Sequence, residues 1–213
     1  MRVIGGNAKG RRLKVPKGQT LRPTADRVKE ALFNILPHDL SGKRILDLFA
    51  GTGNLSIEAL SRGASEAILI DSSPESGKAI RENLQRLAFG DRAKLWIAPA
   101  FRSLRRLSRD NEKFDLIFID PPYEKRWVGK TLEMIAETGV LQDSGIIVVE
   151  HSMREPVEAG YGPLVLQDRR RYGGTLLSLF GYRQNTEDSF RDPSTYGGVR
   201  RALRLRLPIW IFV

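Results

Sequence analysis

The sequence predicts an α/β fold built on a doubly wound, mostly parallel sheet. Between residues 41 and 183, short apolar runs of strand length alternate with amphipathic segments of helical length. The run at 116–119 is apolar at every position, which is typical of a strand buried on both faces. A glycine-rich turn follows the first of these runs. Such alternation indicates a parallel sheet covered by helices, and we expect seven strands preceded by an N-terminal β-hairpin arm.

The composition limits the class of protein. A chain of 213 residues with 41% hydrophobic content suits one globular domain with an appendage. No apolar stretch approaches membrane-spanning length, and the N-terminus lacks the apolar centre of a signal peptide. The absence of cysteine excludes disulfides, a thiolate nucleophile and cysteine-based zinc sites, and two histidines are too few for a histidine-rich metal site. We therefore expect a cytoplasmic protein without a metal, and we take it to be a monomer.

Positive charge is concentrated at the front of the chain. The net charge is +10, and residues 1–44 hold eleven Lys and Arg against three acids, a net of +8. A basic segment before a nearly neutral middle indicates a polyanionic partner. The alternative is a basic face that serves only solubility.

The N-terminal region is expected to be an arm followed by a helix. Residues 1–20 carry four glycines among basic residues, which predicts a hairpin with little core of its own. The helix should begin after Thr24, a good N-cap, and end before Pro37. Its apolar stripe consists of Val28, Ala31, Leu32, Ile35 and Leu36.

The remaining elements follow from the same patterns. Five strands are expected at 45–49, 67–70, 93–97, 116–119 and 145–149, with closing strands at 165–167 and 175–180. Helices are expected at 54–62, 74–87, 102–109 and 127–136. Three regions result: a basic arm and helix at 1–40, the main domain at 41–183, and a C-terminal extension at 184–213. The polar, turn-rich start of that extension predicts flexibility.

The strand at 116–119 ends in Asp120-Pro121-Pro122-Tyr123. The prolines keep the chain extended and donate no N–H, so a carboxylate, a carbonyl and an aromatic ring gather where α/β sheets bind ligands. Asp120 and the Pro121 carbonyl could accept both hydrogens of an exocyclic nucleobase amine and leave its lone pair free to attack an electrophile. Tyr123 could stack on the base, which is worth roughly 1–3 kcal/mol. The alternative is a plain Pro-Pro turn.

A second candidate site is the turn D-L-F-A-G-T-G at 47–53. Its glycines allow close approach of a ligand, and Asp71, after the next strand, is placed to accept both ribose hydroxyls. Asp71 could instead cap the helix at Pro74. A nicotinamide dehydrogenase would fit these features, but Ser56 replaces the third glycine of the dinucleotide pattern. Asp47 would repel a diphosphate and attract an ammonium group, which favours an amino-acid-bearing nucleoside such as S-adenosylmethionine.

These motifs resemble class I S-adenosylmethionine-dependent amino-methyltransferases. The front end, R-V-I-G-G-N-A-K-G-R-R-L with R-P-T-A-D-R-V-K-E-A-L-F-N, resembles the RsmD family, bacterial enzymes that methylate the 2-amino group of a guanine in 16S ribosomal RNA. The resemblance runs from residue 1 to about 180 and includes E-H at 150 and Y-G-G-T at 172.

The resemblance implies a Rossmann-like methyltransferase domain, S-adenosylmethionine as cofactor, and 16S rRNA as partner, within the small ribosomal subunit or an assembly intermediate. Together with the charge it implies three sets of residues. They are Asp120, Pro121, Pro122 and Tyr123 for catalysis, Asp47, Phe49, Gly51, Gly53 and Asp71 for the cofactor, and Lys9, Arg11, Arg12, Arg22 and Arg27 for RNA.

Two features depart from the family pattern. Related enzymes usually carry a polar Asp or Asn that contacts adenine where this chain reads Ala98-Pro99-Ala100, so no side chain is assigned there. Residues 183–213 also extend beyond the pattern. Alternatives that stay open are an adenine- or cytosine-amino methyltransferase acting on DNA, a non-catalytic RNA-binding assembly factor, and the dehydrogenase. Glu150 is either part of the site or merely the end of a strand.

Overall fold

The computed structural model describes residues 1–15, 23–122 and 127–183 of the chain. The helices are α1 (Pro23–Ile35), α2 (Asn54–Ser61), α3 (Pro74–Arg86), α4 (Ala100–Arg109) and α5 (Trp127–Thr138), with a 3-10 turn η1 (Gly90–Arg92). The strands are β1 (Arg44–Asp47), β2 (Glu66–Asp71), β3 (Ala93–Ile97), β4 (Phe114–Ile119), β5 (Leu141–Ser152), β6 (Gly160–Tyr161), β7 (Leu164–Tyr172) and β8 (Thr175–Tyr182).

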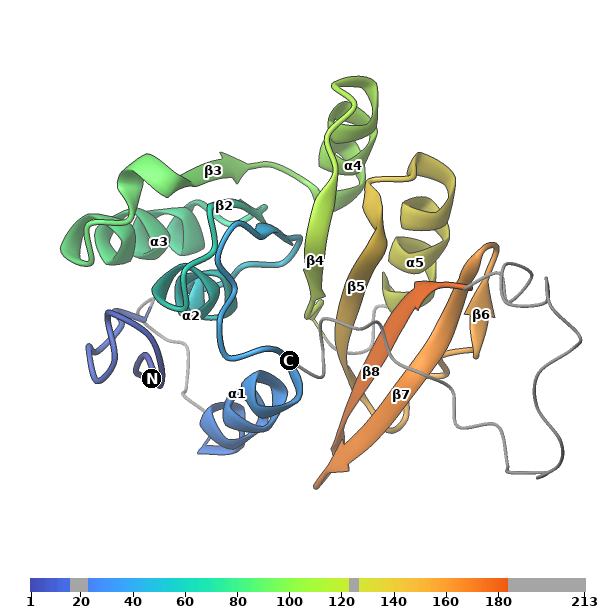
Figure 1. Cartoon of the computed structure of the whole chain (residues 1–213), viewed down its shortest axis with the longest axis horizontal. Coiled ribbons are helices and arrows are strands. Elements are labelled where there is room, and N and C mark those ends of the chain that lie inside the picture. Colours follow the sequence, from blue (N-terminus) through green and yellow to red (C-terminus); the bar gives the residue numbers. More distant parts are fainter. Residues whose placement is uncertain (16–22, 123–126, 184–213) are drawn as a thin grey trace, which may run out of the picture.

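The strands form one sheet in the order β3-β2-β1-β4-β5-β8-β7-β6 (Figure 1). β1 to β5 pair in parallel, whereas β8, β7 and β6 are added to the β5 side by antiparallel pairing. This arrangement confirms the predicted fold class. The described sheet has one strand more than the seven expected, because the two residues of β6 extend its edge and are too short to give a sequence pattern.

Helices cover both faces of the sheet. Alternate residues of each strand point to opposite faces, so two apolar layers form. The first fifteen residues, α1, α2 and α3 pack on the face that carries Ile45, Leu116 and Phe118. α4 and α5 pack on the face that carries Leu46 and Ile117. Within the described residues, no helix has the length and apolar character needed to span a bilayer.

The N-terminal arm folds back on itself as the expected hairpin, although its strand pairing is short. Its only described strand pairing is a single antiparallel bridge between Arg2 and Arg12. The backbone pairs with itself around this bridge, because Val3 N–H donates to the Arg11 carbonyl at 2.9 Å and Leu13 N–H to the Met1 carbonyl at 3.2 Å. α2 adds to this pairing, since the N–H groups of Ile4 and Gly5 donate to the Glu58 carboxylate at 2.8 and 2.7 Å. Gly6 approaches α2 so closely, at φ +70°, that a Cβ there would lie 1.8 Å from the Ser61 carbonyl oxygen.

A buried ionic cluster holds this arm. Glu58 is fully buried, and its carboxylate meets Arg62 at 3.0 Å and Lys29 at 3.3 Å. The Lys29 ammonium also donates to the Arg2 carbonyl at 2.5 Å and to Asn54 at 2.8 Å. Lys29 is only 2% exposed, so it belongs to the interior and not to the basic surface suggested by the charge of this segment.

Asn83 ties the end of the arm to the glycine turn. The side-chain amide of this α3 residue donates to the carbonyls of Lys14, at 3.0 Å, and Thr52, at 3.1 Å, and its oxygen accepts from Lys14 N–H at 2.7 Å. The arm, α3 and the glycine turn are therefore joined through one buried side chain.

Helix and strand boundaries differ from the expected ones in a few places. α1 begins at Pro23, so Thr24 lies inside the helix and does not precede it. Ser73 caps α3 by accepting from Ser76 N–H at 3.3 Å, which is the role that Asp71 was alternatively given. β5 starts four residues earlier than expected, because polar residues 142–144 continue the strand beyond its buried part. The predicted extension at 184–213 lies outside the described residues.

Candidate active site

A cavity of about 190 Å³ lies at the carboxyl ends of β1, β4 and β5. Three carboxylic acids contribute to its wall, together with backbone of the glycine turn and residues of the arm and α1. Its lining consists of Met1, Lys29, Asp47, Phe49, Ala50, Gly51, Thr52, Asn54, Leu55, Asp120 and Glu150.

Strand register explains why the three acids converge. Asp47 pairs with Phe118 across β1 and β4, and Ile119 pairs with Val149 across β4 and β5. Asp120 and Glu150 are the next residues of their strands, so they stand side by side at the sheet edge. Alternation puts both on the face that carries Phe118, which is also the face of Asp47.

The glycine turn presents backbone to this cavity. Gly51 has φ +55°, and a Cβ built on it would meet no atom within 4 Å, because the residue faces the open space of the site. Gly53 has φ +76° and faces the core, where a Cβ would lie 3.1 Å from Leu69. Both positions lie in the left-handed region that favours glycine, but only Gly51 lines the cavity.

Asp71 supports the turn from the end of β2. Its two carboxylate oxygens accept from Gly51 N–H and Ser73 N–H, each at 2.8 Å. Asp71 does not line the cavity itself. Each oxygen has further acceptor capacity beyond its single bond, so the carboxylate can also receive hydroxyl groups of a ligand that lies over Gly51.

Asp47 has an altered acidity. It is 1% exposed, and burial raises its pKa to about 7. The hydroxyl of Ser56, which donates to Asp47 at 2.9 Å, opposes this rise, whereas the negative charge of Asp71 adds to it. A buried carboxyl that ionises near neutrality becomes a strong partner for a cation brought into the cavity.

The structure brings together only part of the residue sets predicted from the sequence. Asp47, Phe49, Gly51 and Asp120 share the cavity, and Gly53 and Asp71 adjoin it. Pro121 is buried and Pro122 exposed directly after Asp120. The predicted RNA-binding residues Lys9, Arg11, Arg12 and Arg27 are exposed and do not line the cavity. Tyr123 and Arg22 lie outside the described residues.

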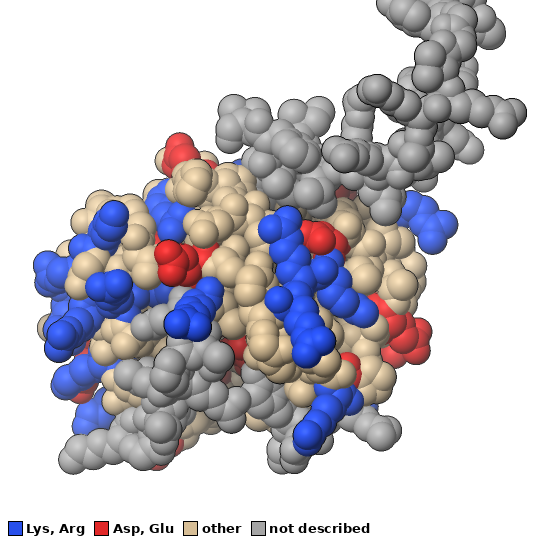
Figure 2. Space-filling view, turned by 90° about the horizontal axis from the view of Figure 1, so that it is seen from below, with Lys and Arg blue, Asp and Glu red and all other residues tan. Residues whose placement is uncertain are grey.

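Figure 2 shows more Lys and Arg than Asp and Glu on the face that it views. The turn between β7 and β8 points to this side of the molecule (Figure 1). That turn lies beside the carboxyl end of β5, because Ser152 pairs with Thr175 at the start of β8. The carboxyl edge that holds the cavity is therefore predominantly basic in its surroundings.

Sequence reasoning left out two groups that lie at the site. Lys29 was counted only as part of the basic segment, and its position on the apolar stripe side of α1 was the signal that it turns inward. An aromatic set adjoins Phe49: Trp127 stacks on its ring at 5.8 Å between centroids, and Phe101 meets Trp127 edge-on at 6.2 Å. These contacts join residues of the glycine turn, α4 and α5, which no local pattern reveals.

The lining chemistry fits a cationic nucleoside. Three carboxylic acids around a small cavity favour an ammonium or sulfonium group and disfavour a diphosphate. Among the described residues, no three His, Asp or Glu side chains are grouped so that they could hold a metal ion. The residues present therefore suit S-adenosylmethionine better than a dinucleotide.

The chain is similar to proteins that bear methyltransferase names. The model of a family described as "Conserved hypothetical protein 95" matches residues 1–181. A Bacillus subtilis (strain 168) protein named "Putative rRNA methyltransferase YlbH" is 38% identical over 183 residues, which cover 86% of this chain and 100% of that protein. "Ribosomal RNA small subunit methyltransferase D" of Escherichia coli (strain K12) is 37% identical over 150 residues, which cover 70% of this chain and 74% of that protein.

Solved structures agree with these relatives. "Putative methyltransferase yhhF from Escherichia coli" superimposes on the chain with a TM-score of 0.73 at 32% identity, and the match covers 87% of this chain and 99% of that one.

Proposed function

Because the chain belongs to the RsmD family of methyltransferases, we propose that it transfers a methyl group from S-adenosylmethionine to the 2-amino group of a guanine in 16S ribosomal RNA. The observation that carries this proposal is the meeting of Asp47, Gly51 and Asp120 at one cavity. A donor site and an amine-accepting carboxylate on the same cavity are what direct transfer between two bound substrates requires.

On the donor side, Asp47 is assigned to the ammonium group of the amino-acid moiety. Its raised pKa supports this role, because a cation beside it would favour the ionised carboxylate. Asp71 is assigned to the ribose hydroxyls, and the hydrogen bond that it accepts from Gly51 N–H fixes its carboxylate relative to the glycine turn. S-adenosylmethionine, when bound, supplies a methyl group activated by its sulfonium charge.

On the acceptor side, Asp120 and the Pro121 carbonyl are assigned to the two amine hydrogens of the target base. They hold the nitrogen so that its lone pair faces the methyl carbon, and positioning then supplies most of the rate. With the donor bound, a carbon–nitrogen bond would form as its carbon–sulfur bond broke, and the nitrogen would then release one proton. Tyr123 is assigned to stacking on the base, which must leave its own stack to enter the site.

The RNA is assigned to the basic arm and α1 through Lys9, Arg11, Arg12, Arg22 and Arg27. Those of these side chains that the structure describes are exposed, while the arm backbone is fixed to α2 and α3. A fixed backbone with outward charges suits phosphate binding, because little order is lost when RNA binds. We assign residues 1–40 to this RNA-binding arm and helix and residues 41–183 to a monomeric, cytoplasmic methyltransferase domain.

The test is methylation in vitro followed by nucleoside analysis. The full chain is incubated with tritiated S-adenosylmethionine and, separately, small ribosomal subunits, deproteinised 16S rRNA and DNA. Label in N2-methylguanosine from subunits or 16S rRNA is the expected result. Label in methylated adenine or cytosine of DNA would show that the substrate is DNA and not rRNA. No label on any nucleic acid would overturn the proposal. Comparing the label in small subunits with the label in deproteinised rRNA shows whether the enzyme acts on the assembled subunit or on rRNA before assembly.

A further inference from the structure

The helix α4 carries an arginine-rich surface that the proposed site does not use. Its buried side is formed by Ala100, Ser103, Leu104 and Leu107. Its exposed side carries four arginines within ten residues, Arg102, Arg105, Arg106 and Arg109. Packing of the helix needs only the buried side, so the arginines are not required for the fold.

Three of these arginines have no partner in the described part of the chain. Arg106 stacks on Trp96, with its guanidinium 4.5 Å from the ring centroid, and pairs with Asp110 at 3.6 Å. Within the described residues, Arg102, Arg105 and Arg109 make neither a hydrogen bond nor an ion pair. Like charges three and four residues apart destabilise a helix, so this spacing favours binding of an anion over stability of the isolated chain.

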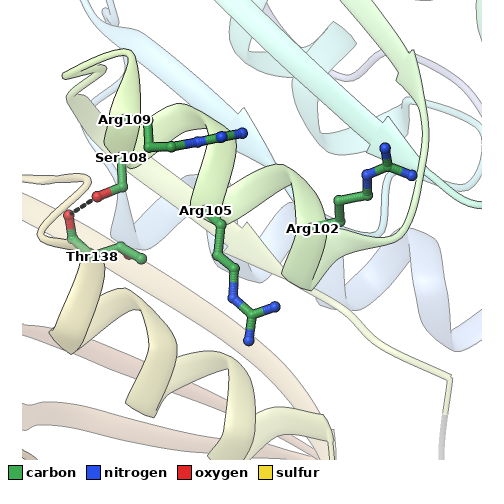
Figure 3. A pocket seen from close by; sticks show the side chains of 5 residues that line it. All are labelled: Arg102, Arg105, Ser108, Arg109 and Thr138. Atoms are coloured by element: carbon green, nitrogen blue, oxygen red, sulfur yellow. Dashed lines mark hydrogen bonds between the residues drawn. The ribbon is translucent and has the colours of Figure 1, made fainter.

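The three arginines surround a hollow that can receive such an anion. Figure 3 shows their side chains projecting from successive turns of α4, above the end of α5. The hollow has a volume of about 460 Å³ and is completed by Ser108 and Thr138, which are joined by a 3.0 Å bond from the serine hydroxyl to the threonine carbonyl. At 1.5 Å rise per residue, the row from Arg102 to Arg109 is roughly 10 Å long, which suits an extended polyanion and exceeds what one phosphate needs.

A second hollow on the other flank of α4 adds apolar surface. It measures about 470 Å³, shares Arg102 and Arg109 with the first, and includes Trp96 and Ile97 of β3. Ile97 is 39% exposed, which is unusual for a large apolar side chain in this structure. Arginines beside aromatic and aliphatic surface are the combination that binds RNA, through phosphates on the charges and bases against the apolar part.

The α4 surface is separate from the N-terminal arm. Leu104 and Leu107 pack on one face of the sheet, whereas Val3 and Leu13 of the arm pack on the other. α4 begins three residues after β3 ends, at the same carboxyl edge that holds the cavity. From that edge α4 runs back toward the opposite edge, where Ser108 bonds to Thr138 shortly before β4 and β5 begin. The row of arginines therefore leads away from the edge at which the target base is proposed to enter.

Building on the proposed function, we propose that the exposed side of α4 is a second RNA-binding surface, where Arg102, Arg105 and Arg109 hold phosphates of the strand that leads away from the target nucleotide. The arm and α4 then hold the RNA on both sides of the site. An acidic protein is a poorer occupant, because its carboxylates would leave the apolar flank at Trp96 and Ile97 without a matching surface.

The test is a charge-removal variant measured by RNA binding, which does not depend on methylation. The triple variant Arg102→Gln, Arg105→Gln, Arg109→Gln is titrated with deproteinised 16S rRNA and with small subunits over a range of salt. Loss of three phosphate contacts should reduce the slope of log affinity against log salt by roughly 2 and weaken binding about tenfold or more at low salt. The Lys triple variant at the same positions keeps the charges and should retain most of the slope.

A control removes charge from the starts of two other strands, away from α4. Lys43 and Lys94 lie at or just before the starts of β1 and β3, and their double Gln variant, compared with Arg102→Gln, Arg105→Gln, should leave the slope unchanged. Equal losses of slope in both Gln variants would mean that only the net charge matters, and this would overturn the proposal. An unchanged slope for the α4 variant would overturn it as well. A loss seen only with assembled subunits would assign α4 to a ribosomal protein. If the wild type methylates nothing, the proposed function fails while this binding comparison still decides on α4.

Discussion

The hydroxyl of Ser56 donates a 2.9 Å hydrogen bond to Oδ2 of Asp47, nine residues earlier, and both side chains are buried. Ser56 stands where dinucleotide-binding turns carry a glycine, which argues against a dehydrogenase. The same residue holds Asp47, the carboxyl that is assigned to the methyl donor. The bond does not keep Asp47 acidic, because burial raises its pKa to about 7.

We expect a pH dependence of stability that is specific to Asp47. Folding raises the pKa of this carboxyl, so the folded state binds the proton more tightly than the unfolded state. The free energy of unfolding should therefore fall as pH rises from about 4 to about 7, by at most roughly 4 kcal/mol. Urea unfolding at pH 5 and pH 8 should show this fall in the wild type and less of it in Asp47→Asn. The exposed Asp91→Asn is the control, and an identical pH dependence in wild type and Asp47→Asn would contradict the assignment.

Asp71→Ala should weaken S-adenosylmethionine binding by about tenfold or more, because it removes the ribose acceptor and the support of Gly51 N–H. Asp71→Asn keeps one acceptor oxygen and should lose less. Isothermal titration calorimetry measures both variants, and NADH should give no measurable heat of binding. Tight NADH binding, or donor affinity unchanged by Asp71→Ala, would count against the assigned donor site.

Asp120→Asn should lower methyl-transfer turnover about 10²-fold or more, because an amide cannot replace the carboxylate as acceptor for both orientation and polarisation of the amine. Affinity for donor and for RNA should stay close to wild type, since Asp120 holds neither the turn nor the arm. Single-turnover kinetics beside binding titrations separate these effects. Asp143→Asn, an exposed acid near the other end of β5, is the control. If Asp120→Asn retained a third of the wild-type turnover, the role assigned to Asp120 in the reaction would be wrong.

Most of the fold could be predicted because it rests on local patterns. The apolar runs that became β1 to β4 and the glycine turn carry their signals within a few residues. The same holds for the acids at 47 and 71, which are the last residues of β1 and β2, and for the acid at 120, which directly follows β4. The resemblance of the front end then supplied what spacing alone does not, the nature of the substrate.

The parts that were not predicted depend on contacts distant in sequence. Nothing near Glu58 indicates that it receives the backbone of the arm, because Ile4 and Gly5 lie more than fifty residues away from it. Lys29 was also miscounted as surface charge, although its position on the apolar side of α1 was a local signal that it is buried. The convergence of Glu150 with Asp120 needs the register of β4 and β5, which a single sequence does not give.

Two glycines of the arm form a matched pair for testing how tightly it packs. Gly6→Ala should destabilise the protein by more than Gly10→Ala, although both residues have positive φ values of 70° and 83°. A Cβ at Gly6 meets backbone of α2, whereas one at Gly10 meets no atom within 4 Å. We expect about 1 kcal/mol for Gly10→Ala from backbone strain alone, and at least twice that for Gly6→Ala. Equal losses in thermal unfolding would mean that the arm is not held against α2.

Replacing Lys9, Arg11 and Arg12 with Ala should flatten the salt dependence of RNA binding and raise the apparent KM for RNA. Each lost phosphate contact reduces counterion release. The melting temperature should fall only slightly, since the one described bond among these side chains runs from Arg11 to the Arg86 carbonyl at 3.2 Å. A salt titration beside a melting curve decides the matter: a lower melting temperature with an unchanged salt slope would make the three residues braces of the fold.

The hydrogen bonds of Asn83 change how the start of this chain opens. Terminal segments usually fray independently, and their amide hydrogens exchange with solvent quickly. Here the side chain that fixes Lys14 also fixes the carbonyl of Thr52, so releasing the arm removes a bond from the glycine turn at the same moment. The amides of both segments should consequently exchange as one cooperative unit, with the first fifteen residues behaving as interior structure.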